Sequence, residues 1–574
     1  MMKSNTWKPI GTVLGETDID QFYFSLKNYK AKKGDIVTTE SRVPSSEGKI
    51  IPVTVWGKIS TIESSNAFFP TEAAQELTNE DIDIRDTILP TTRDELICKV
   101  IILGYTKDED KNTKLLPLNY PVRPAATVKY PSSEDVENLL ISDLNSLHPI
   151  YIGSLLAREA VKIRIDADNL VSRHVSIFGM SGSGKTVMVR RIMHEMLSKK
   201  YPMLVLDIHG DYLGFIQKQK KLYPDNKIKL FYPNLSVSSE DKEIIYTLID
   251  KLGKSLTDPQ KDFLNSLLEK VKYEGGSLLK YIKLLNSKSK EFASTGSTSF
   301  KNIRPASMYV VARSLGQVAK KLENMEQTNF RHRKKMNNLK FEELPDPATE
   351  PEKIVSKGQL SILYLKGYET LPASAIVSIL LENLFKHRQE VNEEIPPFLT
   401  VVEEAHNFIP SRSENKDDLP SVETIRKVIT EGRKFGTGIM IISQRPSRLD
   451  ETIASQCNSQ IIFRMVNQKD QKATRDRSET LDVDDSKQLP NLANGQGIIS
   501  GQVVNFSLPV QIKFDEQLIN EDIGNENFID TVENWDDKES VKLRKKFAKD
   551  FSNIAEIDNR RPNWFLIPFC LKQW

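Results

Sequence analysis

Two patterns of hydrophobic and polar positions divide the chain. Up to about residue 150, short runs rich in β-branched residues are separated by charged or turn-rich segments, as at residues 35–39, 51–59 and 96–104. Runs of this length and composition predict β-strands, and we expect these strands to close into a small barrel. No arrangement typical of a catalytic centre occurs in this part of the sequence, so the candidate chemistry must lie elsewhere.

From about residue 165, strand-like runs are followed by helix-like ones. The first unit consists of a strand at 174–178, a glycine-rich loop, a helix at 187–197 and a strand at 202–207. Because this alternation produces βαβ units, it predicts a mainly parallel sheet that is buried on both faces. Further strands are expected at 227–231, 360–365, 398–402, 438–442, 460–464 and 497–500, and further helices at 373–389 and 420–434.

A lysine-rich stretch with helical periodicity interrupts this pattern at residues 238–345, and we interpret it as an inserted helical subdomain. The tail ends in an apolar run, which we expect to pack either on its own domain or, as a brace, on a neighbouring subunit. The predicted boundaries are 1–150 for the barrel and a linker, 151–237 and 346–515 for the two parts of the α/β core, 238–345 for the insertion and 516–574 for the C-terminal tail.

Composition limits the partners only weakly. The chain has 574 residues, and its 80 Lys and Arg residues against 78 Asp and Glu residues leave a net charge of +2, so any contact with nucleic acid must come from a local patch. The three cysteines, Cys98, Cys457 and Cys570, lack the spacing of a disulfide framework or a zinc site, which favours a reducing cytoplasm. No run approaches the ~18 consecutive apolar residues that would span a bilayer, so we expect no membrane association.

The strongest chemical signal is the glycine-rich loop at residues 179–186, Gly-Met-Ser-Gly-Ser-Gly-Lys-Thr. In this spacing, backbone N–H groups and the positive end of the following helix surround phosphate oxygens, Lys185 reaches the β- and γ-phosphates, and the Thr186 hydroxyl binds Mg²⁺. A chance glycine-rich turn is disfavoured because a strand precedes the loop and a helix follows it. The predicted ATP-binding residues are Gly179, Ser181, Gly182, Ser183, Gly184, Lys185, Thr186 and Val187.

Acidic and polar residues follow three further predicted strands. Glu403 and Glu404 come directly after the strand at 398–402, at the edge where parallel sheets bind ligands. Glu403 is the candidate for the Mg²⁺ side and Glu404 for the general base. Asp207 and Gln444 end two other strands, and Gln444 is suited to sense the γ-phosphate or to position water. Each also has a simpler interpretation. The paired glutamates could lie in a solvated turn, Asp207 could cap a helix or turn, and Gln444 could be an ordinary polar strand end.

Two arginines could stabilise the transition state at a neighbouring subunit's nucleotide. They are Arg433, in Glu-Gly-Arg-Lys-Phe-Gly, and Arg464, at the end of a predicted strand. A surface ion pair is the simpler role for either. A basic cluster at residues 331–335, Arg-His-Arg-Lys-Lys, could contact phosphates, although a short charge run is more often a solvated face.

With these blocks in order, the chain resembles the HerA-type ATPases of the HerA/FtsK superfamily, which are hexameric DNA-pumping motors. Ile10-Gly-Thr-Val and Gly34-Asp35 are similar to the small barrel that precedes the motor in this family. Glu403 departs from the family, which more often has Asp at this position. The motif-bearing region spans 174–513, and besides the glycine loop the resemblance rests on residues 204–212, 403–408, 431–436, 443–447 and 489–501.

The resemblance implies an α/β fold with a RecA-like P-loop ATPase core and a small N-terminal β-barrel, while the inserted helical subdomain predicted from the sequence pattern lies outside the resemblance. It also implies a homo-hexameric ring with ATP at the subunit boundaries, Arg433 completing the neighbour's site and double-stranded DNA in the central pore. A separate nuclease or sirtuin-like effector would dock on the barrel, in DNA-end processing or in defence against phage.

Two other functions stay open. One is a nucleotide-dependent scaffold that organises an effector without obligatory DNA pumping, and the other is a secretion or conjugation ATPase that moves protein. A GTPase is disfavoured because residues 467–470, Asn-Gln-Lys-Asp, have the wrong order for a guanine-reading motif.

Overall fold

The computed structural model describes residues 7–27, 29–44, 48–65, 95–107, 114–141, 148–222, 227–237, 242–295, 303–335, 340–390, 394–412, 419–478, 480–481 and 483–518. Contacts divide the chain into two units, and all described residues belong to the first, Met1–Ile519. The predicted C-terminal tail beyond residue 518 lies outside the described residues.

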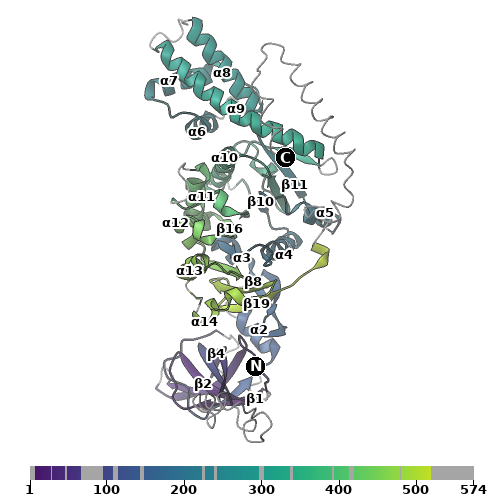
Figure 1. Ribbon diagram of the computed structural model, residues 1–574, viewed down its shortest axis with the longest axis vertical. Helices are drawn as coiled ribbons and strands as arrows, with labels where there is room; N and C mark the ends of the chain where they lie inside the picture. Colours follow the sequence, from purple (N-terminus) through teal and green to yellow (C-terminus); the bar gives the residue numbers. More distant parts are fainter. Residues whose placement is uncertain are drawn as a thin grey trace, which may run out of the picture. The chain divides into compact units, whose positions relative to one another are not determined.

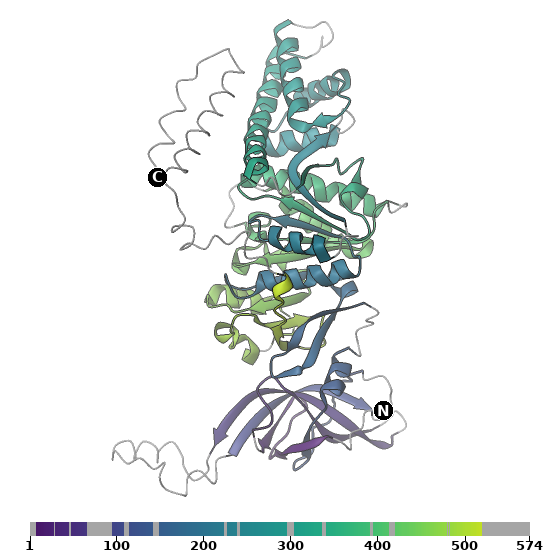
Figure 2. The same ribbon diagram turned by 90° about the vertical axis from the view of Figure 1, so that its right-hand side faces the viewer.

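A closed antiparallel barrel forms near the N-terminus, as predicted (Figures 1 and 2). In β2, Phe22, Phe24 and Leu26 are buried and alternate with more exposed residues, which is the period of two that fills a small barrel from inside. Within the described residues the strand order around the barrel is β1 (Lys8–Leu14), β2 (Gln21–Leu26), β5 (Glu95–Lys107), β4 (Ile50–Ser65), β3 (Ile36–Pro44) and β6 (Thr127–Tyr130).

The α/β core is built on one large sheet. From β11 to β17, neighbouring strands of this sheet are parallel, and beyond β17 they are antiparallel. Strands β12 and β13 both pair with β11. The order is β12 (Gly276–Ser277), β11 (Lys227–Val237), β14 (Gln359–Tyr364), β10 (Met203–Asp207), β15 (Phe398–Val402), β16 (Thr437–Ser443), β9 (Val175–Phe178), β17 (Ser459–Phe463), β18 (Gln496–Gly501), β19 (Leu508–Ile512), β7 (Pro149–Leu155) and β8 (Arg158–Asp166), with β13 (Phe341–Leu344) beside β11.

The mainly parallel sheet confirms the predicted fold. The sequence pattern does not predict its antiparallel end, and the burial of the strands differs between the two parts. Every residue of β9, β10, β15, β16 and β17 is buried, as expected for central strands covered on both faces. In β8, by contrast, buried positions are interrupted by exposed ones, and its hairpin with β7 joins the sheet only through the pairing of β7 with β19, which lies far along the chain.

Helices cover both faces of the parallel strands. Figures 1 and 2 place α4 (Lys185–Ser198) and α5 (Leu213–Leu222) on one face, with α10 (Thr370–Gln389) and α11 (Pro420–Glu431) on the other. Buried residues occur all around α10, because this helix packs against both α11 and the insertion. The shorter helices are α2 (Ser133–Ile141), α3 (Ala167–Ser172), α12 (Glu451–Ser455), α13 (Gln468–Asp476) and α14 (Val483–Ser486), with 3₁₀ turns η4 (Pro351–Lys353), η5 (Ala405–Asn407), η6 (Gly432–Phe435), η7 (Pro446–Arg448), η8 (Leu489–Asn491) and η9 (Glu516–Leu518).

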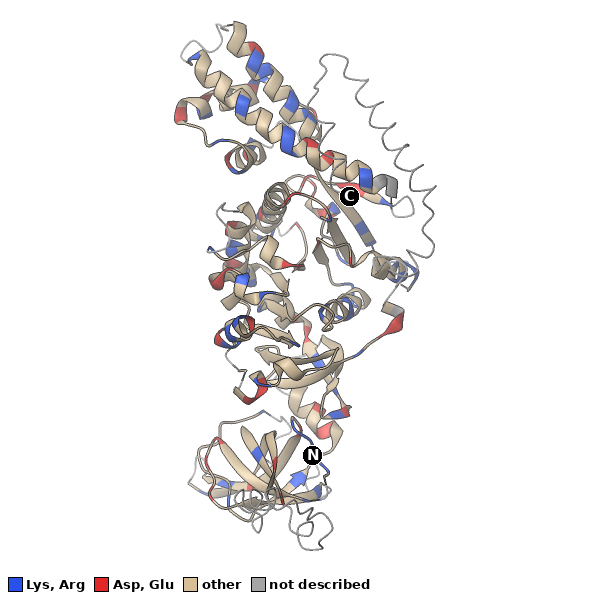
Figure 3. Cartoon of the chain, in the orientation of Figure 1, with Lys and Arg blue, Asp and Glu red and all other residues tan. Residues whose placement is uncertain are grey.

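The inserted helical subdomain is also confirmed. It contains α6 (Lys242–Leu252), α7 (Asp258–Lys270), α8 (Leu278–Thr295) and α9 (Pro305–Lys335). Its buried side chains, such as Leu264 and Leu315, belong to the same hydrophobic cluster as Phe178 of the core sheet. Lys and Arg residues recur along α8 and α9 (Figure 3). The predicted boundaries between the parts stay predictions.

Two buried ion pairs join the barrel to the core. Lys58 Nζ of β4 lies 2.6 Å from Asp485 Oδ2 of α14, and it also donates to the Ser507 carbonyl. The Arg158 guanidinium of β8 lies 2.6 Å from Asp35 Oδ1, at the start of β3, and stacks on the Tyr130 ring. Such pairs fix geometry, because a buried charge that loses its partner is strongly destabilising.

None of the described helices is both long and apolar enough to cross a membrane.

The Lys58–Asp485 pair gives a test of how the barrel is held. Asp485→Asn should destabilise the protein by about 3–5 kcal/mol, because Lys58 would stay buried and charged without its carboxylate. A lowered midpoint of thermal unfolding measures the effect. The control is Lys58→Met with Asp485→Asn, which removes both charges, keeps a hydrogen-bond acceptor and should regain most of the lost stability. A double variant as unstable as Asp485→Asn would contradict the explanation.

Candidate nucleotide-binding and hydrolysis site

The glycine loop joins β9 to α4, as the sequence predicts, and its backbone depends on glycine. Gly179, Gly182 and Gly184 all have positive φ, at 154°, 73° and 117°. Lys185 begins α4, and its Nζ donates to the Met180 carbonyl at 2.9 Å, so the side chain crosses back over the loop. Thr186 and Val187 follow in the first turn of α4. The N–H groups at this helix end are those that favour an anion.

Residues from β17 and from the segment before β18 hold the loop in place. The Met180 N–H donates to the Arg464 carbonyl at 2.9 Å, and the Gly495 N–H donates to the Ser183 carbonyl at 2.9 Å. A Cβ on Gly184 would lie 3.1 Å from Gly495 Cα and 3.2 Å from the Phe463 ring. Residue-level reasoning missed Phe463 and Gly495. In the sequence, only residues 489–501, which resemble the corresponding motif of HerA-type ATPases, indicated a role for this segment.

Strand order brings the predicted acidic and polar residues to the edge where the loop lies. β10, β15, β16 and β9 are consecutive parallel neighbours, so their carboxyl ends share one edge. Asp207 ends β10, Glu403 and Glu404 follow β15, and Gln444 follows β16. The order was not deducible from the motifs, because the chain visits these strands in the order β9, β10, β15 and β16.

Asp207 and Glu403 form a buried acidic pair. Burial raises the pKa of Asp207 to about 6, although the Gly210 N–H, which donates to Asp207 Oδ1 at 2.7 Å, acts in the opposite direction. Burial also raises the pKa of Glu403 well above its usual range, and the nearby charge of Asp207 adds to the effect. The Tyr212 hydroxyl donates to Glu403 Oε1 at 3.3 Å. The sequence motifs predict no role for Tyr212.

This pair fits a divalent cation. Within the described part of the chain, Asp207 Oδ2 and Glu403 Oε2 are buried oxygens without a hydrogen-bond partner. Carboxylate oxygens are the ligands that Mg²⁺ prefers, and a bound cation would reverse the upward pKa shifts of both acids.

Glu404 is held differently from Glu403. Its backbone lies in the left-handed region at φ 41°, which costs about 1–3 kcal/mol for a residue other than glycine. Its carboxylate accepts a hydrogen bond from Gln444 Nε2 and lies 3.3 Å from His406 Nδ1. Burial acts to raise the pKa of Glu404, but the contacts with His406 and Gln444 outweigh it, so this pKa lies below its ordinary value. Glu404 is therefore the acid of the site that stays ionised most readily, as a proton acceptor must be.

Gln444 connects this carboxylate to the phosphate loop. Its Oε1 accepts a hydrogen bond from the Ser181 hydroxyl at 3.2 Å, while its Nε2 donates to Glu404. Burial lowers the pKa of Lys185, although the charges of Glu404 and Glu403 act in the opposite direction. An anion in the loop would favour the charged form of Lys185.

The two candidate arginines lie at opposite edges of the sheet. Arg433 is exposed in η6, before the amino end of β16, whereas the phosphate loop lies beyond its carboxyl end. Seven strand residues separate the two edges by about 20 Å, so Arg433 cannot reach the loop of its own subunit. Arg464 lies beside that loop, and its Nε donates to the Pro490 carbonyl at 3.2 Å.

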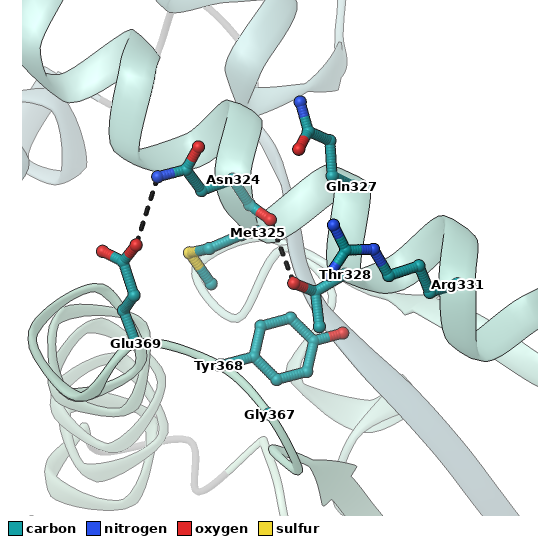
Figure 4. A pocket seen from close by; sticks show the side chains of 8 residues that line it. All are labelled: Asn324, Met325, Gln327, Thr328, Arg331, Gly367, Tyr368 and Glu369. Carbon is teal, nitrogen blue, oxygen red and sulfur yellow. Dashed lines mark hydrogen bonds between the residues drawn. The ribbon is translucent and has the colours of Figure 1, made fainter. Parts of the chain in front are cut away.

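A cavity of about 300 Å³ lies apart from this site, between α9 and the segment after β14 (Figure 4). None of the predicted nucleotide-site residues lines it. Arg331, from the predicted basic cluster, does line it, while the side chains of 333–335 lie outside the described residues, and contact with nucleic acid there stays a prediction. The lining residues are Asn324, Met325, Gln327, Thr328, Arg331, Gly367, Tyr368 and Glu369.

Comparison with known proteins agrees with the motifs. Residues 150–384 match the family model of the central domain of helicase HerA. The chain is 27% identical to a probable helicase of Methanocaldococcus jannaschii, over 89% of this chain and 97% of the relative. It is 26% identical to the DNA double-strand break repair helicase HerA of Pyrococcus furiosus, over 88% and 92%. VirB4 of Thermoanaerobacter pseudethanolicus aligns at 12% identity with a TM-score of 0.41, over 66% of this chain and 99% of that one, a likeness too weak to assign function.

The fold and the site define the class of this protein as a P-loop ATPase. Within that class it is similar to the HerA type, because the match of residues 150–384 and the relatives agree with the resemblance that the motifs carry.

Proposed function

We propose that this protein is a ring-forming motor that hydrolyses ATP to translocate on double-stranded DNA, together with a separate nuclease or other effector. One observation carries the proposal. The phosphate loop, Glu404 and Gln444 meet at one edge of the sheet, while Arg433 lies about 20 Å away at the other edge. A hydrolytic site divided in this way is suited to subunits that complete one another. Several relatives are named DNA double-strand break repair helicases, which favours DNA as the substrate.

Each site residue has a distinct task in the proposed reaction. The loop residues Gly179–Thr186 and Val187 surround the ATP phosphates, and Lys185 offsets their negative charge. The Thr186 hydroxyl and Glu403, with Asp207 beside it, would hold Mg²⁺, which when bound neutralises charge on the phosphate oxygens. Glu404 accepts the proton of the attacking water, and Gln444 positions that water between Glu404 and the loop.

The placement of Arg433 favours a closed ring. The tight turn that carries it depends on glycine, because a Cβ on Gly432 would lie 2.5 Å from the Thr437 carbonyl oxygen. The exposed arginine is therefore presented from a rigid turn. A head-to-tail interface would bring this edge of one subunit to the nucleotide edge of the next, and such interfaces form a ring when the rotation between subunits closes. We propose a homo-hexamer with double-stranded DNA in its central pore.

The partner and pathway are more distant proposals. The barrel is the proposed docking surface for a nuclease or sirtuin-like effector, in the cytoplasm, for DNA-end processing or defence against phage. A scaffold that organises an effector without DNA pumping is the alternative, and it would use the same ATP site.

Stimulation of ATP hydrolysis by DNA separates the motor from the scaffold. We expect linear double-stranded DNA to raise the kcat of the purified full-length protein several-fold, because a translocase couples turnover to movement along its substrate. Single-stranded DNA of equal length is the control. If double-stranded DNA left the rate of hydrolysis unchanged, both alone and with a co-purified partner, the result would contradict the motor hypothesis and favour the scaffold.

Nucleotide binding and turnover should separate between two variants. Lys185→Ala should lose most ATP binding, because it removes the charge that meets the β- and γ-phosphates. Glu404→Gln should keep ATP affinity within about threefold and lower kcat by about 10²–10⁴-fold, the usual contribution of a general base. Equilibrium titration with a fluorescent ATP analogue, alongside steady-state hydrolysis, measures both. An equal loss of binding in the two variants would overturn these roles.

Mixing subunits tests the proposed role of Arg433. Arg433→Ala and Lys185→Ala should each be inactive as a pure ring. In equal mixtures, half of the subunits keep the loop and half keep the arginine, so about one quarter of the interfaces combine an intact loop with an intact arginine. The rate of ATP hydrolysis should return in proportion to these intact interfaces. It is measured after the two variants are unfolded and refolded together. Mixed rings as inactive as the pure ones, or a fully active Arg433→Ala ring, would argue against an arginine acting in trans.

A further inference from the structure

His406 is a site residue without a role in the function proposed so far. It lies in η5, directly after the two acids that end β15, and its side chain is only about a quarter exposed. Its Nδ1 lies 3.3 Å from Glu404 Oε2, the carboxylate oxygen that Gln444 does not contact. The two atoms are within ion-pair distance but are not aligned as a hydrogen bond, and neither has another hydrogen-bond partner among the described residues. The two oxygens of Glu404 therefore have different neighbours, one from β16 and one from η5.

The backbone around Glu404 is fixed as well. The Asn407 N–H donates to the Glu404 carbonyl at 2.9 Å, and the Asn407 side-chain amide donates to the same oxygen at 3.1 Å. Two further N–H groups, of Phe408 and Ile409, donate to the Ala405 carbonyl, and all three of these side chains are buried. The turn is thus anchored in the core. This anchoring directs the Glu404 side chain toward the loop edge and places His406 beside it.

We propose that His406 is a positioning residue for ATP hydrolysis. It orients the Glu404 carboxylate from the side opposite Gln444, so that one lone pair of Glu404 points at the attacking water. The inference rests on the proposed role of Glu404 as the general base. A carboxylate held by a single contact can rotate about its terminal bond, whereas contacts at both oxygens restrict that rotation. Loss of such alignment lowers turnover while leaving the binding of the phosphates to the loop unchanged.

Three variants of the full-length protein test this proposal. His406→Ala should lower the kcat of ATP hydrolysis by roughly 10–100-fold, the effect of a misaligned catalytic group, while the KM and the dissociation constant for Mg·ATP change by less than about threefold. His406→Asn should return kcat to within about threefold of the wild type, because the Asn side-chain nitrogen occupies nearly the position of Nδ1 and can turn an N–H toward the same oxygen. His148→Asn, in an exposed ring that packs on Tyr201 away from the site, should leave kcat unchanged.

A fourth variant shows whether His406 acts through Glu404. In the Glu404→Gln background, adding His406→Ala should lower kcat no further, because two residues that act as a unit are not additive. A kcat for His406→Ala equal to the wild type would overturn the proposal. So would an equal loss of Mg·ATP binding, a His406→Asn variant as slow as His406→Ala, or an additive loss in the double variant. If Glu404→Gln itself kept wild-type turnover, the proposed general base would fail instead, which distinguishes the two failures.

Discussion

The parallel pairing of β10, β15, β16 and β9 is the constraint on which the site depends. Because side-by-side parallel strands end at the same edge, Asp207, Glu403, Gln444 and the phosphate loop meet there without any further device. A strand inserted between β9 and β16 would separate the loop from Gln444 by the width of a strand, about 4.8 Å, and break the contact with Ser181. The chemistry of the protein is therefore decided first by strand order and only then by side chains.

The three acids differ in character although they share that edge. Asp207 and Glu403 are buried at the ends of two neighbouring strands and keep oxygens that fit a cation, whereas the turn after β15 directs Glu404 toward Gln444 and His406. The left-handed backbone of Glu404 is the point at which the two environments diverge. A strained turn costs stability, and here it separates a cation-binding acid from a proton-accepting one.

The segment between β17 and β18 contacts both the phosphate loop and the barrel. Gly495 and Arg464 contact the loop, and Asp485, in the same stretch of chain, forms the buried pair with Lys58 of β4. The barrel is thus attached to the part of the core that braces the nucleotide site, and Arg433 is presented from the opposite edge of the sheet.

Local sequence determined much of this protein. The glycine loop, the apolar strands with acids at their ends and the period-two runs of the barrel each depend on neighbouring residues, and the barrel, the parallel sheet and the helical insertion were predictable for that reason. Contacts between distant segments were not. The pairing of β19 with β7, and the contacts of Phe463 and Gly495 with the phosphate loop, were decided only by the tertiary structure. The distance of Arg433 from its own loop belongs with them, because these relations depend on which strands lie side by side, and hydrophobic periodicity carries no information about strand order.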